Sequence, residues 1–307
     1  MPQYLIQHLT RYTYEDAVSV CHHLAHLLPR EGGVPGHLWW SAELDITPAP
    51  AVRSERRDYF GNRVTFFAIQ EPHRELSVFS HGHVDIVPAP SMPLFGSLPW
   101  EQVRDALAHH PLGTPVDRES LDAFGYTFAS PYVQWTPEIA AYAAESFMAG
   151  RPIVEASLDL MARIHRDFTY DTKSTTVHTT LPEVMIARAG VCQDFAHLII
   201  GCLRSLGLPA RYVSGYLLTA PPPGGVRLTG ADASHAWASV YVPGFAGSGG
   251  GSGGGWLDLD PTNNQVPSDK HITLAWGRDF GDVSPLRGVI LGGGRHTVVV
   301  NVDVSPA

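Results

Sequence analysis

Apolar and polar residues alternate along much of the first hundred residues, which is the period of a β-strand. The first such run, residues 6–14, reads Ile-Gln-His-Leu-Thr-Arg-Tyr-Thr-Tyr. Further strand-like runs lie at residues 18–28, 38–47, 63–69 and 75–87. Gly, Pro, Asn and Asp residues separate these runs, and several short strands at such spacing predict an antiparallel β-sandwich.

The apolar pattern changes to helical spacing after about residue 99. Helices are predicted at residues 100–110, 136–148, 152–168, 181–189 and 192–206. In the last of these, Phe195, Ile199, Cys202 and Leu206 recur at steps of four, three and four, the buried stripe of an amphipathic helix. Strands are predicted at residues 234–242, 256–262, 288–291 and 296–304. The change of period indicates an α+β protein with a β-rich domain at 1–95 and a second domain at 96–307.

Cys192 opens the predicted helix 192–206, directly after Gly190 and Val191. The first N–H groups of a helix are unpaired and lie at the positive end of its dipole, so both favour the thiolate, which is the nucleophilic form. A small residue that fills the core is the commoner role of a lone cysteine. Position alone therefore leaves both interpretations open.

The two strands after this helix carry the other candidate residues. If they form a hairpin with His235 opposite Asp260, then Trp237 faces Asp258. Directly opposed residues have Cβ atoms roughly 5 Å apart, so a carboxylate can hold one imidazole nitrogen and leave the other for a thiol. Cys192, His235 and Asp260 would then be nucleophile, base and orienting group, with Asp258 as the second candidate for the last role.

Three segments together resemble the transglutaminase-like superfamily of cysteine enzymes: Gly190-Val191-Cys192, Ser234-His235-Ala236-Trp237, and Gly255-Trp256-Leu257-Asp258-Leu259-Asp260-Pro261-Thr262. The resemblance implies a papain-like catalytic core at 96–307, in which helices pack on an antiparallel sheet. It assigns the nucleophile to Cys192, the base to His235 and the third position to Asp260. Residues 6–14 and 58–62 resemble the N-terminal region of bacterial members, and the run Gly-Arg-Asp-Phe at 277–280 also resembles that subgroup.

The same resemblance implies thiol-dependent acyl transfer on peptide or glutamine-type amides through a thioester. Hydrolysis by a cysteine peptidase or amidase is favoured, because bacterial members are usually interpreted as proteases. Amine transfer, as in a transglutaminase, and a non-catalytic peptide-binding module on the same fold are the alternatives. No cofactor is implied. The oxyanion of such a reaction needs donors, and the backbone N–H of Cys192 is the first, with Tyr170 or Gln193 as candidates for the second.

The composition of the chain limits the kinds of partner and the location that can be expected for it. The formal net charge of −9 argues against nucleic acid or an anionic membrane as partner, so a peptide or protein substrate is expected. The three cysteines are too few and too scattered for a disulfide framework. The first residues lack the basic and apolar regions of a signal peptide, and no apolar run reaches the length of a membrane span. A cytoplasmic location is therefore expected, and the oligomeric state stays open.

The 16 histidines raise the question of a metal site. His22, His23 and His26 are close in sequence, as are His81 and His83, but on a strand His23 faces away from His22 and His26. Solvated sheet histidines are the favoured interpretation. His197 is expected to pack or hydrogen-bond locally. The Gly/Ser-rich run 245–255 is expected to be a flexible hairpin-tip insertion rather than a lid.

Overall fold

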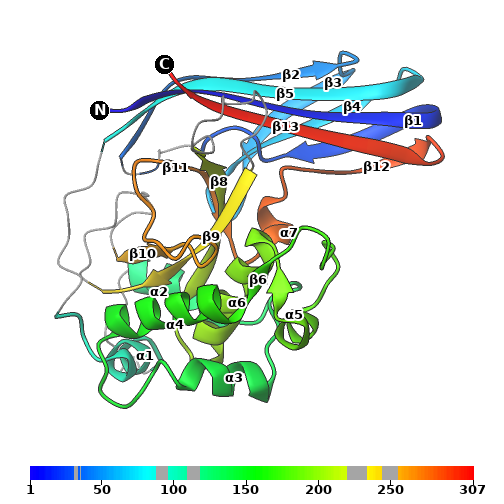
Figure 1. Ribbon diagram of the computed structural model, residues 1–307. Coiled ribbons are helices and arrows are strands. Elements are labelled where there is room, and N and C mark those ends of the chain that lie inside the picture. Colours follow the sequence, from blue (N-terminus) through cyan, green and yellow to red (C-terminus); the bar gives the residue numbers. More distant parts are fainter. Residues whose placement is uncertain (31–33, 35, 88–95, 109–117, 220–233, 244–254) are drawn as a thin grey trace, which may run out of the picture.

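A seven-stranded antiparallel sheet covers one side of a core of helices and a smaller sheet (Figure 1). This arrangement comes from a computed structural model, which describes residues 1–30, 34, 36–87, 96–108, 118–219, 234–243 and 255–307. The Gly/Ser-rich run expected at 245–255 lies outside the described residues except for Gly255. None of the helices within these ranges is long and apolar enough to cross a membrane.

The large sheet is built on one long strand, β1 (Gln3–Ala25). Its partners are β2 (His37–Thr47), β3 (Val52–Arg57), β4 (Arg63–Ile69), β5 (His73–Ile86), β12 (Leu286–Gly292) and β13 (His296–Pro306). The first half of β1 lies between β5 and β13, and its second half lies between β4 and β12. Buried apolar side chains from β2 and β5 meet others from β4 and the second half of β1 in one cluster. The predicted antiparallel sandwich is therefore present, with β1 continuous through both of its layers.

The C-terminal strands return to this N-terminal sheet. Strand β13 pairs with β1 from Tyr4 opposite Pro306 to Tyr14 opposite His296. The predicted division at residue 95 placed all of 96–307 in the core, whereas the pairing places 286–306 in the sandwich. Periodicity identifies strands but not their partners, and these partners lie almost a whole chain length apart in sequence.

The core contains a four-stranded antiparallel sheet in the order β10-β9-β8-β11. Its strands are β8 (Ala210–Leu217), β9 (Ser234–Tyr241), β10 (Trp256–Leu259) and β11 (His271–Gly277). The helices are α1 (Trp100–Ala108), α2 (Arg118–Phe124), the 3-10 helix η1 (Gly125–Thr127), α3 (Pro137–Ala144), α4 (Ile153–Asp167), α5 (Leu181–Ala187), α6 (Cys192–Ser205) and α7 (Phe280–Val283). Two short strands, β6 (Thr169–Tyr170) and β7 (Ala189–Gly190), pair in parallel just before α6.

Helix α6 is the central helix of this core. Its stripe residues Phe195, Ile199 and Cys202 are buried, as the sequence predicts. The helix packs against β8 and β9 on one side and against α3, α4 and α5 elsewhere. The α+β fold class and the packing of helices on an antiparallel sheet are confirmed.

A turn of the sandwich is hydrogen-bonded to the core sheet. The Asn62 amide donates to the carbonyl of Trp276 at 2.8 Å and accepts the Trp276 N–H at 3.1 Å. Arg30 donates to the same amide oxygen at 2.7 Å and lies 3.4 Å over the Trp276 ring. Asn62 thus occupies the position of a strand neighbour to β11, which gives the run 58–62 a structural role in joining the two halves.

Candidate active site

The start of α6 is fixed by the residues around Cys192. Gly190 lies in β7, and a Cβ there would come within 2.9 Å of the Asp194 side chain, so only glycine fits without a shift. The Asp194 carboxylate accepts the Val191 N–H at 2.8 Å and the Thr175 hydroxyl at 2.6 Å. An acceptor on an N-terminal N–H holds the first turn in place. Cys192 is partly exposed there, whereas the other two cysteines are buried.

His235, the second residue of β9, connects the thiol to a carboxylate. Its Nε2 lies 2.8 Å from Asp260 Oδ2, and its side chain interacts with Cys192 closely enough for the cysteine to raise its pKa. Because Nε2 is engaged by Asp260, the nitrogen left for the thiol is Nδ1. Burial on its own lowers the pKa of His235, but the hydrogen bonds and charges of Asp260 and Cys192 outweigh it and raise the pKa to about 10. The imidazole is therefore protonated at neutral pH.

Asp260 is fully buried yet surrounded by donors. Its Oδ2 accepts from His235, from His271 Nε2 at 3.0 Å and from Asn263 Nδ2 at 2.7 Å. Its Oδ1 accepts the backbone N–H groups of Thr262 at 3.0 Å and Asn263 at 3.2 Å. Burial raises the pKa of this carboxyl, but the hydrogen bonds from His235 and His271 outweigh it and hold the pKa well below its usual range. Asp260 is therefore a buried anion that these donors stabilise.

His271 is the part of this site that the sequence interpretation missed. It begins β11, is fully buried and meets the ring of Trp237 edge to face at 5.2 Å. The Ser268 N–H points at His271 Nδ1 at 3.4 Å, so Nδ1 is the acceptor and Nε2 carries the proton given to Asp260. Every residue of β11 is buried, and a polar residue in such an apolar strand is the signal that could have identified it.

The predicted hairpin register is wrong by two residues. Asp258 lies opposite Ser239 and Leu259 opposite Ala238, which brings Asp260 level with Trp237 rather than His235. His235 and Asp260 are therefore diagonal neighbours, and side chains of this length reach across such a diagonal. The other candidate, Asp258, accepts a hydrogen bond from the Ser239 hydroxyl instead.

The two candidates for the second oxyanion donor, Tyr170 and Gln193, differ in position and exposure. Tyr170 lies in β6 opposite Gly190 and is 53% exposed. Burial raises the pKa of its phenol, and so does the charge of Cys192. Gln193 is partly buried at the second position of α6. Both residues stay candidates for the second donor.

The expectation of solvated histidines in the sandwich is met only in part. His22 and His83 are exposed and His81 is partly exposed, but His23 and His26 are buried. His23 stacks on Phe67 with ring centroids 5.1 Å apart, and His26 Nδ1 donates to the Ser284 carbonyl at 3.1 Å.

His197 has the local role that was expected. It is buried, its Nε2 accepts the N–H of Phe280 at 3.1 Å, and its ring stacks on Tyr132.

One group of three potential metal ligands occurs among the described residues, and it is His235, Asp260 and His271, whose donor atoms lie within 4.8 Å of one another. Two imidazoles and a carboxylate form a set that transition metals accept. Here each Nε2 is directed at the same carboxylate oxygen, and hydrogen bonds satisfy all three groups. The arrangement of the three residues is therefore that of a hydrogen-bonded group in which no metal ion is needed to satisfy the donor atoms.

A central helix with a thiol at its first residue, packed on an antiparallel sheet that carries a histidine, defines the papain-like class of fold. Residues 4–85 match the bacterial transglutaminase-like N-terminal region, and residues 141–261 match the transglutaminase-like superfamily. The chain belongs to the transglutaminase-like superfamily.

Relatives of similar length match the chain over almost its whole length. An uncharacterized protein of Mycobacterium tuberculosis is 44% identical over 309 residues, which cover 99% of this chain and 93% of the relative. An uncharacterized protein of Mycobacterium leprae is 31% identical over 304 residues, covering 98% and 97%. The crystal structure of a "Putative Cysteine Protease" from Cytophaga hutchinsonii superposes with a TM-score of 0.71 at 20% identity, covering 99% of this chain and 90% of that one. At this identity the superposition shows a shared fold.

Proposed function

We propose that this protein is a thiol-dependent acyl-transfer enzyme that hydrolyses peptide or glutamine-type amides, with Cys192 as nucleophile, His235 as acid and base, and Asp260 as the orienting carboxylate. The observation that carries the proposal is the position of His235, bound to Asp260 at 2.8 Å and close enough to Cys192 for the cysteine to raise its pKa. A nucleophile, a base within reach of it and a third group that orients the base are the parts that covalent catalysis requires.

In the proposed reaction the Cys192 thiolate attacks the amide carbonyl carbon and forms a C–S bond. The backbone N–H of Cys192 and either Tyr170 or Gln193 donate to the resulting oxyanion. His235 gives its Nδ1 proton to the amide nitrogen, the C–N bond breaks, and the amine leaves behind a thioester. Water then attacks the thioester, gives one proton to His235 and displaces the thiolate, which releases a carboxylic acid.

Water and an amine can resolve the same thioester, so hydrolysis and amine transfer share the first half of the reaction. Hydrolysis is favoured because the structural neighbour from Cytophaga hutchinsonii is named as a cysteine protease. The alternative of a non-catalytic peptide-binding module is disfavoured by the partial exposure of Cys192 beside a charged histidine.

The proposal is tested by alkylation with iodoacetamide across pH, followed by mass spectrometry of each cysteine. An ordinary thiol has a pKa of about 8.5 and holds only about one thiolate in 300 at pH 6. We expect Cys192 to react fast at pH 6 in the wild type and about a hundredfold more slowly in His235→Ala, because the variant lacks the imidazolium. The two buried cysteines, Cys21 and Cys202, are internal controls. Equal rates for Cys192 in both proteins would refute the thiolate–imidazolium pair.

Hydrolysis and amine transfer are separated by incubating the enzyme with a casein substrate and a fluorescent primary amine. Cleavage without label incorporation supports the hydrolase. Incorporation without cleavage supports the transglutaminase alternative, with the same three residues in the same roles.

A further inference from the structure

A concave region lies between the sandwich and the core, and the candidate triad does not line it. Two cavities of about 490 and 700 Å³ share Tyr59, Phe60, Asp122 and Tyr126 in their walls and form one groove, called here the joint groove. Among the described residues that line it, none belongs to the candidate triad. Cavities of this size are typical of small-molecule sites.

The joint groove is positively charged in a protein that is acidic as a whole. Its lining includes six arginines: Arg30, Arg56, Arg118, Arg211, Arg278 and Arg287. Its carboxylates are Asp58, Glu119, Asp122 and Asp282. Six arginines against four carboxylates leave an excess of two positive charges, while the whole chain carries −9. A cleft with such an excess concentrates anions.

The carboxylates at one end of the groove already have protein partners. Asp58 accepts the N–H and the side-chain amide of Asn62 at 2.7 and 2.8 Å. Asp282 accepts from Arg278 at 2.8 and 2.9 Å. Three arginines, Arg56, Arg278 and Arg287, face the two carboxylates Asp58 and Asp282 at this end, which leaves an excess of one positive charge.

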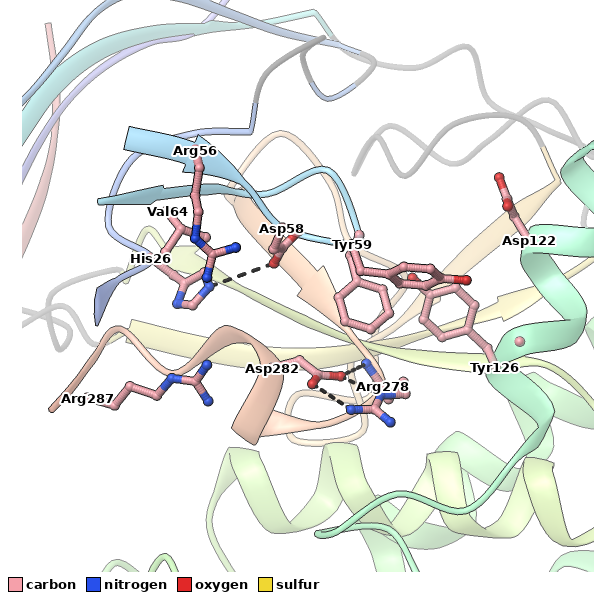
Figure 2. Close-up of a pocket in the computed structure, with 12 residues that line it drawn as sticks. His26, Arg56, Asp58, Tyr59, Val64, Asp122, Tyr126, Arg278, Asp282 and Arg287 are labelled. Carbon is pink, nitrogen blue, oxygen red and sulfur yellow. Dashed lines mark hydrogen bonds and ion pairs between the residues drawn. The ribbon is translucent and has the colours of Figure 1, made fainter. Parts of the chain in front are cut away.

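Two arginines at the same end have no carboxylate partner within the described part of the chain. The Arg56 side chain forms no hydrogen bond or ion pair there, and Arg287 donates only to the carbonyl of Gly281 at 2.9 Å. Both side chains are exposed. Figure 2 shows their guanidinium groups reaching into the cavity, Arg56 from β3 and Arg287 from β12.

Aromatic rings form the wall that continues into the second cavity. Tyr59 is 90% exposed and contacts Phe60 edge to face at 5.1 Å, and Phe60 lies 5.9 Å from Tyr126. Figure 2 shows Tyr59 and Tyr126 at the end of the cavity away from Arg287. An exposed tyrosine next to the partly buried ring of Phe60 and the buried ring of Tyr126 offers a flat apolar contact surface.

We propose that the joint groove binds a small organic anion, with its phosphate or carboxylate between Arg56 and Arg287 and its aromatic or apolar body against Tyr59. The forked guanidinium group pairs with the oxygens of either anion through two parallel hydrogen bonds. Because β3 and β12 belong to the sandwich while η1 and α7 belong to the core, a bound anion also contacts both halves. This site is independent of the proposed amidase activity.

The test is isothermal titration calorimetry of the full chain with phenyl phosphate, benzoate, inorganic phosphate and, as the neutral probe, benzyl alcohol. We expect phenyl phosphate or benzoate to bind and benzyl alcohol not to bind. Whichever of the two anions binds more tightly identifies the anionic group that the site prefers. Arg56→Gln and Arg287→Gln are each expected to weaken binding about tenfold, since each removes one charge-assisted pair. Tyr59→Ser is expected to weaken phenyl phosphate but not inorganic phosphate.

Arg295→Gln is the matched control. Arg295 is exposed at the β12–β13 turn, outside the groove, and its substitution removes the same charge from the protein. Thermal melts verify that every variant is folded. Absence of binding by both organic anions at millimolar concentration overturns the proposal. So does an affinity that is equal in the wild type and in the variant lacking both Arg56 and Arg287.

Discussion

Two cysteine–histidine pairs occur in this protein, one inside the sandwich and one at the start of α6. In the sandwich, Cys21 Sγ lies 3.8 Å from His73 Nε2, and the cysteine is fully buried. His73 Nδ1 lies 2.8 Å from the carbonyl oxygen of Glu71, so Nδ1 carries the proton and Nε2 is the acceptor. Burial raises the pKa of the Cys21 thiol, although a backbone hydrogen bond at Ile69 opposes it. The Cys21 thiol is therefore protonated at neutral pH.

The pair at α6 has the same two groups in different surroundings. His235 is held by the carboxylate of Asp260 instead of a carbonyl, and Cys192 is partly exposed. A carbonyl orients an imidazole, while an anion also stabilises its protonated form. Contact between a thiol and an imidazole is therefore not sufficient for a reactive cysteine. The charge of the third group and access to the sulfur decide the chemistry.

The largest effect on activity expected from this comparison comes from replacing each of the two cysteines with alanine. Cys192→Ala should lower kcat/KM for peptide cleavage by about a thousandfold or more, because the covalent step is lost. Cys21→Ala should leave kcat/KM unchanged and lower the free energy of unfolding by about 1 kcal/mol, through a small cavity in the sandwich. Peptide cleavage assays and urea melts measure the two effects. Full activity in Cys192→Ala would exclude the proposed mechanism.

The next effect comes from converting the Asp260 anion into a neutral group. Asp260→Asn should lower kcat/KM by about a hundredfold to ten-thousandfold. The variant should also move the alkaline limb of the pH profile. The raised pKa of His235, about 10, keeps the proton-donating form present below that pH and removes it above. Without the carboxylate that pKa falls, so the limb should shift to lower pH.

Measurement of kcat/KM between pH 5 and 11 in both proteins tests this prediction. A limb at the same pH in Asp260→Asn and in the wild type would mean that Asp260 does not support the protonated imidazole. Circular dichroism verifies that the variant stays folded.

Local patterns in the sequence predicted the parts of the site that depend on one segment. The stripe of α6 and the position of Cys192 follow from a single helix, predicted at 192–206 and observed at Cys192–Ser205. The residues of the candidate triad came from the family resemblance, and the structure places His235 against Asp260. Strand β3 was missed because all six of its residues are exposed, so it has no apolar alternation.

The parts that failed depend on how separate segments pack together. The register of β9 with β10 is wrong by two because a Gly/Ser-rich connection carries no information on register. His271 lies only 11 residues from Asp260 in sequence, but no local pattern shows that the start of β11 meets the end of β10. Asn62 contacts Trp276 across more than two hundred residues. Such contacts depend on tertiary packing that no local period encodes.

The smallest effect tests whether His271 positions Asp260. His271→Leu removes one of the three donors to Asp260 Oδ2, and we expect kcat/KM to fall about tenfold and the alkaline limb to move toward lower pH, because hydrogen bonds to a charged group contribute about 1.5–3 kcal/mol. His271→Gln keeps a donor and should restore most of the rate. His73→Leu is the matched control, since it removes a buried imidazole that faces Cys21 instead of a carboxylate. It should lower stability without moving the pH profile. An equal shift of the limb in His271→Leu and His271→Gln would show that packing, not the donated proton, is what His271 supplies.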